Sequence, residues 1–132
     1  MDPISDMLIR ITNAQAVRHE RVVIPFSRVK FDIAQLLKSA GYVTDVERAT
    51  RKAQTAEVDI ISVTLKYQDG RGAISGVKLI SRPSRHLYTK AHQVRPVRSG
   101  YGTLVLTTPK GIMTGAQARK EHVGGELMFE IW

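Results

Sequence analysis

Threonine, lysine and glycine gather in one short segment that could bind a ligand, Thr107-Thr108-Pro109-Lys110-Gly111. Because strand-like sequence lies on both sides, we expect a tight loop that presents two hydroxyls, backbone groups and one ammonium at its tip. Hydroxyl and backbone groups can contact base edges or a 2′-OH in the wide minor groove of RNA, and Lys110 can contact phosphate. An ordinary hairpin turn would have the same sequence, so both interpretations stay open here.

Two further segments could support an RNA contact. Ser81-Arg82-Pro83-Ser84-Arg85-His86-Leu87-Tyr88 places cations beside an aromatic ring on which a base could stack, although Tyr88 could equally be a core residue of a strand. Gly124-Gly125-Glu126 places one acid at a double-glycine turn, where a ligand can approach the backbone and the carboxylate can accept a hydrogen bond from a base. The candidates from these segments are Ser81, Arg82, Pro83, Arg85, Tyr88, Gly124, Gly125 and Glu126.

Catalytic and metal-binding patterns are absent from the sequence. The chain has no cysteine, and its four histidines are scattered without the spacing of metal ligands. It contains neither a G-x-S-x-G elbow nor a G-x-x-x-x-G-K-[ST] loop. We therefore expect no enzyme activity, no metal, no cofactor and no small-molecule substrate. The competing hypothesis is an enzyme acting on RNA or a nucleotide, with Glu126 and a histidine as acid and base.

The distribution of charge favours a polyanionic partner. The net charge is +8, and positions 67–132 carry ten Lys/Arg against four Asp/Glu, whereas positions 1–66 carry ten against eight. Residues 71–120 contain ten basic residues and no acid. A surface without carboxylates suits contact with phosphates, so we expect nucleic acid to bind the second half. Chance clustering on a solvated surface is the alternative.

Hydrophobic spacing predicts an α+β fold of two small domains, residues 1–68 and 69–132. The first domain should have the order αβαββ, with Ser27 capping its second helix, Gly41 ending that helix, and a polar loop over residues 49–56. The second should be mostly antiparallel β with one short helix capped by Thr114, and residues 73–80 should form a strand. The expected elements of the first domain are helices over 3–17 and from Ser27, and strands over 21–25, 42–47 and 58–67.

Neither a membrane nor a secretory pathway is indicated. The sequence begins Met1-Asp2-Pro3, unlike the basic start of a signal peptide, and no apolar run approaches the roughly 18–20 residues of a membrane span. We expect a cytoplasmic protein.

Taken together, these motifs resemble the S-eight family of the small ribosomal subunit, in its bacterial form. The match covers nearly the whole chain, and its C-terminal part, with Thr107-Thr108, Lys110-Gly111 and Gly124-Gly125-Glu126, is the most specific. The other matching segments are Asp2-Pro3-Ile4-Ser5-Asp6-Met7-Leu8, Arg10-Ile11, Asn13, Pro25, Ser27-Arg28-Val29-Lys30, Leu37-Lys38, Gly41-Tyr42, Leu65-Lys66-Tyr67, Ser81-Arg82-Pro83, Tyr88, Gly100, Gly102, Met113-Thr114 and Ala118-Arg119.

The resemblance implies a primary 16S rRNA-binding protein that helps to assemble the central domain and platform of the small subunit. It implies that the C-terminal domain contacts an irregular rRNA helix in its minor groove, through the Thr107 and Thr108 hydroxyls and the backbone near Lys110 and Gly111. Partners implied are the ribosomal proteins S-five and S-twelve, and some members bind their own operon mRNA. Residues implied to touch a neighbouring rRNA segment are Asp2, Pro3, Asn13, Arg28 and Lys30.

Four positions depart from the usual pattern of the family. Pro109 replaces a serine and removes both a hydroxyl and a backbone N–H from the loop. Ser84 replaces a glycine, His86 an arginine, and Thr12 a frequent second arginine.

A further alternative function is a protein-interaction scaffold that uses an exposed C-terminal strand near Phe129 and Trp132.

Overall fold

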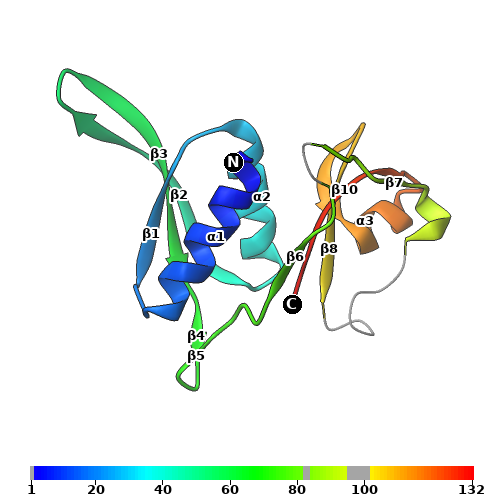
Figure 1. Ribbon diagram of the computed structural model, residues 1–132, viewed down its shortest axis with the longest axis horizontal. Coiled ribbons are helices and arrows are strands. Elements are labelled where there is room, and N and C mark those ends of the chain that lie inside the picture. The colour runs from blue at the N-terminus through cyan, green and yellow to red at the C-terminus, as the bar shows by residue number, and fades with distance from the viewer. Residues whose placement is uncertain (1, 82–83, 95–101) are drawn as a thin grey trace. The chain divides into compact units, whose positions relative to one another are not determined.

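The computed structural model describes residues 2–81, 84–94 and 102–132. The chain divides into two compact units, Pro3–Ala73 and Ile74–Trp132, and each contains its own sheet (Figure 1). The expected α+β fold is confirmed, with αβαββ in the first unit and an antiparallel sheet with a short helix in the second.

Two helices and a three-stranded antiparallel sheet make up the N-terminal unit, with strand order β1-β3-β2. A two-residue turn at Asp69 and Gly70, both with positive φ, then joins a small hairpin. The elements are α1 (Pro3–Ala16), β1 (Arg21–Pro25), α2 (Arg28–Ser39), β2 (Val43–Ala53), β3 (Ala56–Leu65), β4 (Tyr67–Gln68) and β5 (Arg71–Gly72).

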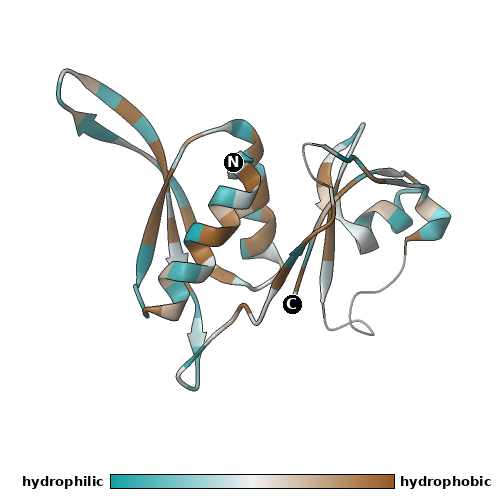
Figure 2. Ribbon diagram, viewed as in Figure 1, coloured by the Kyte–Doolittle hydropathy of each residue, from teal (hydrophilic) through white to brown (hydrophobic). Residues whose placement is uncertain are grey.

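Local sequence signals explain where α2 begins and ends. The Ser27 Oγ accepts a hydrogen bond from the Lys30 backbone N–H at 3.2 Å, which satisfies one donor of the first turn. Gly41 has a φ of +88°, the left-handed conformation that glycine adopts without steric cost. Apolar residues of both helices are buried, and Figure 2 shows hydrophobic and hydrophilic residues alternating along them.

The prediction of a polar loop over residues 49–56 is wrong. Strand β2 continues to Ala53 and pairs with β3 down to Ala56, so only Gln54 and Thr55 form the turn. Because β1 pairs with β3 only as far as Ile60, the outer part of the β2–β3 hairpin is a two-stranded arm (Figure 1). Its side chains are exposed, and the sequence therefore lacks the alternation of apolar residues that identifies a half-buried strand.

The C-terminal unit is built around β10, which pairs with neighbours along both edges. The sheet order is β6-β10-β8-β9, and β7 pairs with the N-terminal part of β10. The strand expected over residues 73–80 is shorter than predicted and covers only Val77–Leu79. Before it, the Trp132 carbonyl accepts hydrogen bonds from both the Ser75 and the Gly76 N–H groups. The elements are β6 (Val77–Leu79), β7 (Tyr88–Thr89), η1 (Ala91–Gln93), β8 (Thr103–Thr108), β9 (Gly111–Thr114), α3 (Gly115–Lys120) and β10 (Gly125–Ile131).

A β-bulge between Leu127 and Phe129 determines which residues of β10 share a face. Leu127 lies opposite Leu106, whereas Phe129 lies opposite Val105, so the two β10 side chains point to opposite faces of the sheet. Leu106 and Leu127 belong to the cluster that packs on α3, and Phe129 is fully buried on the other face. The bulge therefore lets β10 contribute apolar residues to both faces.

No helix in the described part of the chain is long and apolar enough to cross a membrane.

Candidate nucleic-acid interface

The segment Thr107–Gly111 forms the expected tight hairpin between β8 and β9. Thr108 pairs with Gly111, and Pro109 and Lys110 occupy the tip, where the fixed φ of proline suits the first central position of a turn. Gly111 has a φ of +112°, so its lack of a Cβ is needed to complete the turn. The proline that departs from the family pattern thus lies at a position where its backbone geometry is compatible with the loop.

The two threonines of this hairpin have different surroundings. The Thr108 hydroxyl accepts the Lys110 N–H at 3.1 Å and donates to the Gly111 carbonyl at 2.8 Å, and the residue is only 8% exposed. Thr107 is half-buried on β8, and its hydroxyl has no partner within the described segments. Of the two hydroxyls, one therefore closes the turn and the other is available to a ligand.

Three candidate residues from separate segments form one row across the sheet. Glu126 of β10 lies directly opposite Thr107 of β8 on one side and Tyr88 of β7 on the other. Directly paired residues in neighbouring strands have Cβ atoms about 4.5–5.5 Å apart and share a face of the sheet. The row Thr107–Glu126–Tyr88 therefore presents a hydroxyl, a carboxylate and an aromatic ring side by side.

Tyr88 is 71% exposed, which decides between the two interpretations of this residue. The interpretation of Tyr88 as a core residue is wrong, because its side chain is exposed on the two-residue strand β7. An exposed ring beside hydrogen-bonding groups is the arrangement on which an unpaired base can stack.

The double glycine Gly124-Gly125 allows two chain segments to approach closely. A Cβ on Gly125 would overlap the Thr107 carbonyl, and one on Gly124 would overlap the Thr89 carbonyl. Neither glycine has a positive φ. The two glycines therefore let the backbones of β8 and β7 lie close to the start of β10. This close approach brings Thr107, Glu126 and Tyr88 together in one row.

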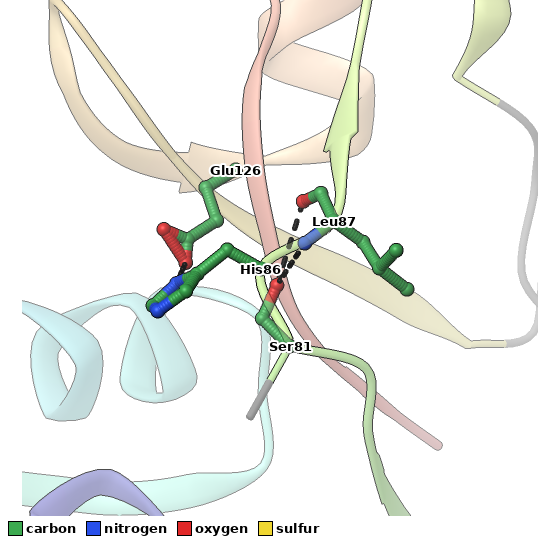
Figure 3. Close-up of polar contacts among 4 residues, drawn as sticks. All are labelled: Ser81, His86, Leu87 and Glu126. Atoms are coloured by element: carbon green, nitrogen blue, oxygen red, sulfur yellow. Dashed lines mark hydrogen bonds and ion pairs between the residues drawn. The ribbon is translucent and has the colours of Figure 1, made fainter. Parts of the chain in front are cut away.

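His86 contacts the row through Glu126, and Ser81 contacts Leu87, the residue before Tyr88. His86 Nδ1 lies 2.8 Å from Glu126 Oε2, and Figure 3 shows the two side chains pointing toward each other. The Ser81 hydroxyl accepts the Leu87 N–H at 3.0 Å. The His86–Glu126 pair has no local sequence pattern, because it depends on the pairing of β7 with β10 across about forty residues.

The N-terminal candidates lie on or beside the two helices. Because β1 runs back along α1, the chain begins α2 near the start of α1, and Figure 1 shows both helices starting at the same end of the unit. Asp2 and Pro3 are therefore brought to the same end as Arg28 and Lys30. Asn13 is exposed but lies ten residues along α1 from Pro3, about 15 Å away at the helical rise.

Arg82 and Pro83 lie outside the described residues. Ser84 and Arg85 are exposed, and so are Pro109 and Lys110 at the hairpin tip.

Ion pairing differs between the two units. Within the described residues, the N-terminal unit has four ion pairs, including Lys38–Asp45 at 3.0 Å and Arg48–Asp59 at 2.9 Å. In the described part of the C-terminal unit, the one ion pair is His86–Glu126, so no lysine or arginine there is paired with a carboxylate. The unpaired lysines and arginines are Lys78, Arg85, Lys90, Lys110, Arg119 and Lys120.

Asp45 has a clear electrostatic perturbation. The hydrogen bond from Lys38 holds the pKa of its carboxyl below the ordinary value, and a backbone hydrogen bond at Val46 acts in the same direction. The Asp45 carboxylate therefore forms a structural contact within the N-terminal unit.

The described residues contain no group of three or more histidines and acids that could hold a metal ion. A surface hollow is lined by Ala91 and His92 of η1, Arg119 of α3 and His122 just after α3, with no carboxylate among these residues. The lining of this hollow suits an anion.

An antiparallel sheet with a row of polar and aromatic residues, among cations that lack carboxylate partners in the described part, is typical of nucleic-acid-binding proteins. Comparison with known sequences is more specific. Residues 2–132 match the family model described as Ribosomal protein S8. The chain belongs to this family, and it is a non-enzymatic, structural ribosomal protein.

Individual relatives cover the chain almost completely. "Small ribosomal subunit protein uS8" of Brevibacillus brevis is 46% identical over 132 residues, 99% of this chain and 97% of the relative. The protein with the same name from Nitratidesulfovibrio vulgaris (strain DSM 19637 / Miyazaki F) is 44% identical over 131 residues, 99% of this chain and 98% of the relative. The family resemblance predicted from sequence is confirmed, and so is the prediction that the chain is not an enzyme.

Proposed function

We propose that this chain is a primary 16S rRNA-binding protein that binds the central domain and helps to assemble the platform of the small ribosomal subunit. The observation that carries the proposal is the row Thr107–Glu126–Tyr88, which has hydrogen-bonding and stacking groups on one face of the sheet. Hydroxyl and carboxylate groups can contact base edges or 2′-OH groups, and the ring can stack on an unpaired base. Membership of the ribosomal protein S8 family supports this choice of RNA.

The two parts of the chain have different roles in this proposal. Residues 69–132 form the main RNA-binding domain, because acids are scarce there: residues 71–120 contain ten lysines and arginines and no acid. Residues 1–68 contribute a second contact with neighbouring rRNA, through Asp2, Pro3, Arg28 and Lys30 at the shared end of the two helices and Asn13 farther along α1. The protein is then located in the cytoplasm with the ribosome.

Protein and mRNA partners follow from the same proposal. Neighbouring ribosomal proteins, S-five and S-twelve by family resemblance, would contact surfaces that the RNA leaves free. An operon mRNA that imitates the rRNA site would bind the row Thr107–Glu126–Tyr88 and compete with rRNA. The alternative scaffold role of the C-terminal strand is wrong as stated, since Phe129 is fully buried and β10 is paired along both edges.

A binding isotherm with a central-domain rRNA fragment tests the proposal. We expect the full chain to bind this fragment at least about a hundredfold more tightly than a scrambled fragment of the same length, at near-physiological salt. Equal affinity for both RNAs would exclude specific central-domain binding. A competition experiment with the chain's own operon mRNA tests the regulatory role. If the role is correct, the mRNA displaces the rRNA fragment at a comparable concentration.

A further inference from the structure

One hydroxyl connects Ser81, two residues after β6, to Leu87, the residue before β7. Ser81 Oγ accepts a hydrogen bond from the Leu87 N–H at 3.0 Å and donates to the Leu87 carbonyl at 3.4 Å, as Figure 3 shows. The same Leu87 carbonyl accepts the Leu127 N–H of β10 at 2.8 Å. Leu87 is therefore held from two directions, by the Ser81 side chain and by the backbone of β10.

These hydrogen bonds lie next to two of the proposed RNA-binding residues. Leu87 precedes Tyr88, and Leu127 follows Glu126. Strand β7 has only two residues, so its own ladder to β10 consists of the pairs Glu126–Tyr88 and Gly125–Thr89. A two-residue strand is weak alone, and an exposed ring receives little support from packing. The orientation of Tyr88 therefore depends on the bonds that fix Leu87.

The Glu126 carboxylate is held by the same segment. His86 Nδ1 lies 2.8 Å from Glu126 Oε2, and the carboxylate side chain is 22% exposed whereas the imidazole is 52% exposed. A hydrogen bond from the imidazole restricts the rotamer of Glu126 and leaves its second oxygen for another donor.

We propose that Ser81 and His86 are positioning residues, which hold Tyr88 and Glu126 in the orientation that binds RNA, and that Ser81 and His86 do not themselves contact the RNA. This inference rests on the proposed function. It changes the role expected for Ser81, which the sequence placed among the residues in direct contact, and it gives a role to His86, whose type departs from the family pattern.

The geometric part of the inference is tested without RNA, by amide hydrogen exchange on the full chain. Ser81→Ala removes the hydroxyl that accepts from the Leu87 N–H, so the Leu87 amide should exchange at least about tenfold faster. Amides inside β8 should keep their rates. Ser84→Ala, at an exposed serine three residues away, is the matched control and should leave the Leu87 amide unchanged. An unchanged Leu87 rate in Ser81→Ala would overturn the inference.

The functional part is tested by a double-mutant cycle against the central-domain fragment. Ser81→Ala should weaken binding about fivefold in the wild-type background and less than about twofold in a Tyr88→Ala background, because Ser81 acts through Tyr88. His86→Gln should likewise lose its effect when Glu126→Gln is present. Losses that simply add in both cycles would indicate direct RNA contacts and would refute the positioning role.

Salt dependence and stability separate the remaining explanations. Ser81→Ala should leave the slope of log affinity against log salt unchanged, since no phosphate contact is lost. Ser81→Thr keeps the hydroxyl and should restore most of the affinity, whereas general unfolding would appear as a lowered Tm in Ser81→Ala. If the wild-type chain fails to distinguish the central-domain fragment from its scrambled partner, the proposed function itself fails. If the wild-type chain does distinguish the two fragments but the losses of the double-mutant cycles add, only the positioning role is rejected.

Discussion

Thr107 and Thr108 are adjacent in sequence and have separable roles at the scale of single residues. Thr108 has both of its hydroxyl hydrogen bonds inside the turn, whereas the Thr107 hydroxyl has no partner in the described part of the chain. Thr107→Ala should therefore weaken binding to the central-domain fragment by about 1–3 kcal/mol and leave the Tm unchanged. Binding isotherms and thermal unfolding on the same sample measure both quantities.

The matched variant is Thr108→Val, which keeps the shape of the side chain and removes its hydroxyl. The Lys110 N–H then loses its acceptor, so the free energy of unfolding should fall by about 1 kcal/mol. Any loss of RNA affinity should accompany loosening of the hairpin, measured as faster exchange of the Lys110 amide. The assignment of roles is contradicted if Thr107→Ala lowers the Tm as much as Thr108→Val does.

Asp45 provides a pH prediction in the N-terminal unit. Its pKa is lowered first by the hydrogen bond from Lys38, so the folded state releases the proton of this carboxyl more readily than the unfolded chain. The resulting stabilisation is present above the unfolded pKa and is lost as the pH falls through the lower folded pKa. Lys38→Met should raise the Asp45 pKa toward its ordinary value in an NMR titration, and Lys30→Met should not.

At the scale of elements, α3 ends in a conformation that strains one side chain. His122 has a φ of 57°, and the Val123 N–H donates to the Ala118 carbonyl at 3.0 Å, which is the hydrogen bond of a Schellman motif. Glycine is preferred at this position because it has no Cβ. His122→Gly should stabilise the chain by about 0.5–1 kcal/mol in urea unfolding. His122→Ala keeps a Cβ and should give no such gain.

The outer part of the β2–β3 hairpin should open independently of the sheet. Its strands pair only with each other beyond Ile60, and its residues are exposed, whereas Ile61 and Val63 are fully buried beside β1. Amides from Thr50 to Ala53 should exchange orders of magnitude faster than those of Ile61 and Val63. Comparable protection along the whole hairpin would show that another contact stabilises the arm.

Elements with a strong local signal could be predicted from the sequence, and elements that depend on distant pairing could not. Ser27 and Gly41 marked the ends of α2, and Thr114 marked the start of α3, because helix caps depend on residues a few positions apart. The arm was missed because exposed strands lack alternation of apolar residues. The bulge at Leu127 and Phe129 was also missed, because it depends on the register with β8.

The candidate site shows the same division. Its residue types and the hairpin that carries Thr107 were predicted from sequence, but the row Thr107–Glu126–Tyr88 depends on strand pairing between residues about twenty and forty positions apart. The family resemblance supplied the candidate residues without their mutual arrangement. The inward-facing Thr108 hydroxyl and the His86–Glu126 pair are visible only in three dimensions.

At the scale of the whole molecule, the arrangement of charge matters more than the total of +8. Positions 1–66 carry eight acids against ten lysines and arginines, and four of these acids form ion pairs, whereas positions 67–132 carry four acids against ten, and Lys110 has no carboxylate partner among the described residues. A cation that is paired within the protein releases fewer counterions from RNA than an unpaired one. The C-terminal cations should therefore determine most of the salt dependence of RNA binding.

This difference gives a prediction that compares two single charge removals. Lys110→Gln should lower the slope of log affinity against log salt for the central-domain fragment by roughly one, because one phosphate contact is lost. Arg48→Gln removes the same charge from a residue that is paired with Asp59 at 2.9 Å and stacked over the Phe26 ring, so it should leave the slope nearly unchanged. Isotherms at four or more salt concentrations measure both slopes. Equal changes for the two variants would mean that RNA responds to net charge alone, and that the unpaired cations of the C-terminal unit have no special part in binding.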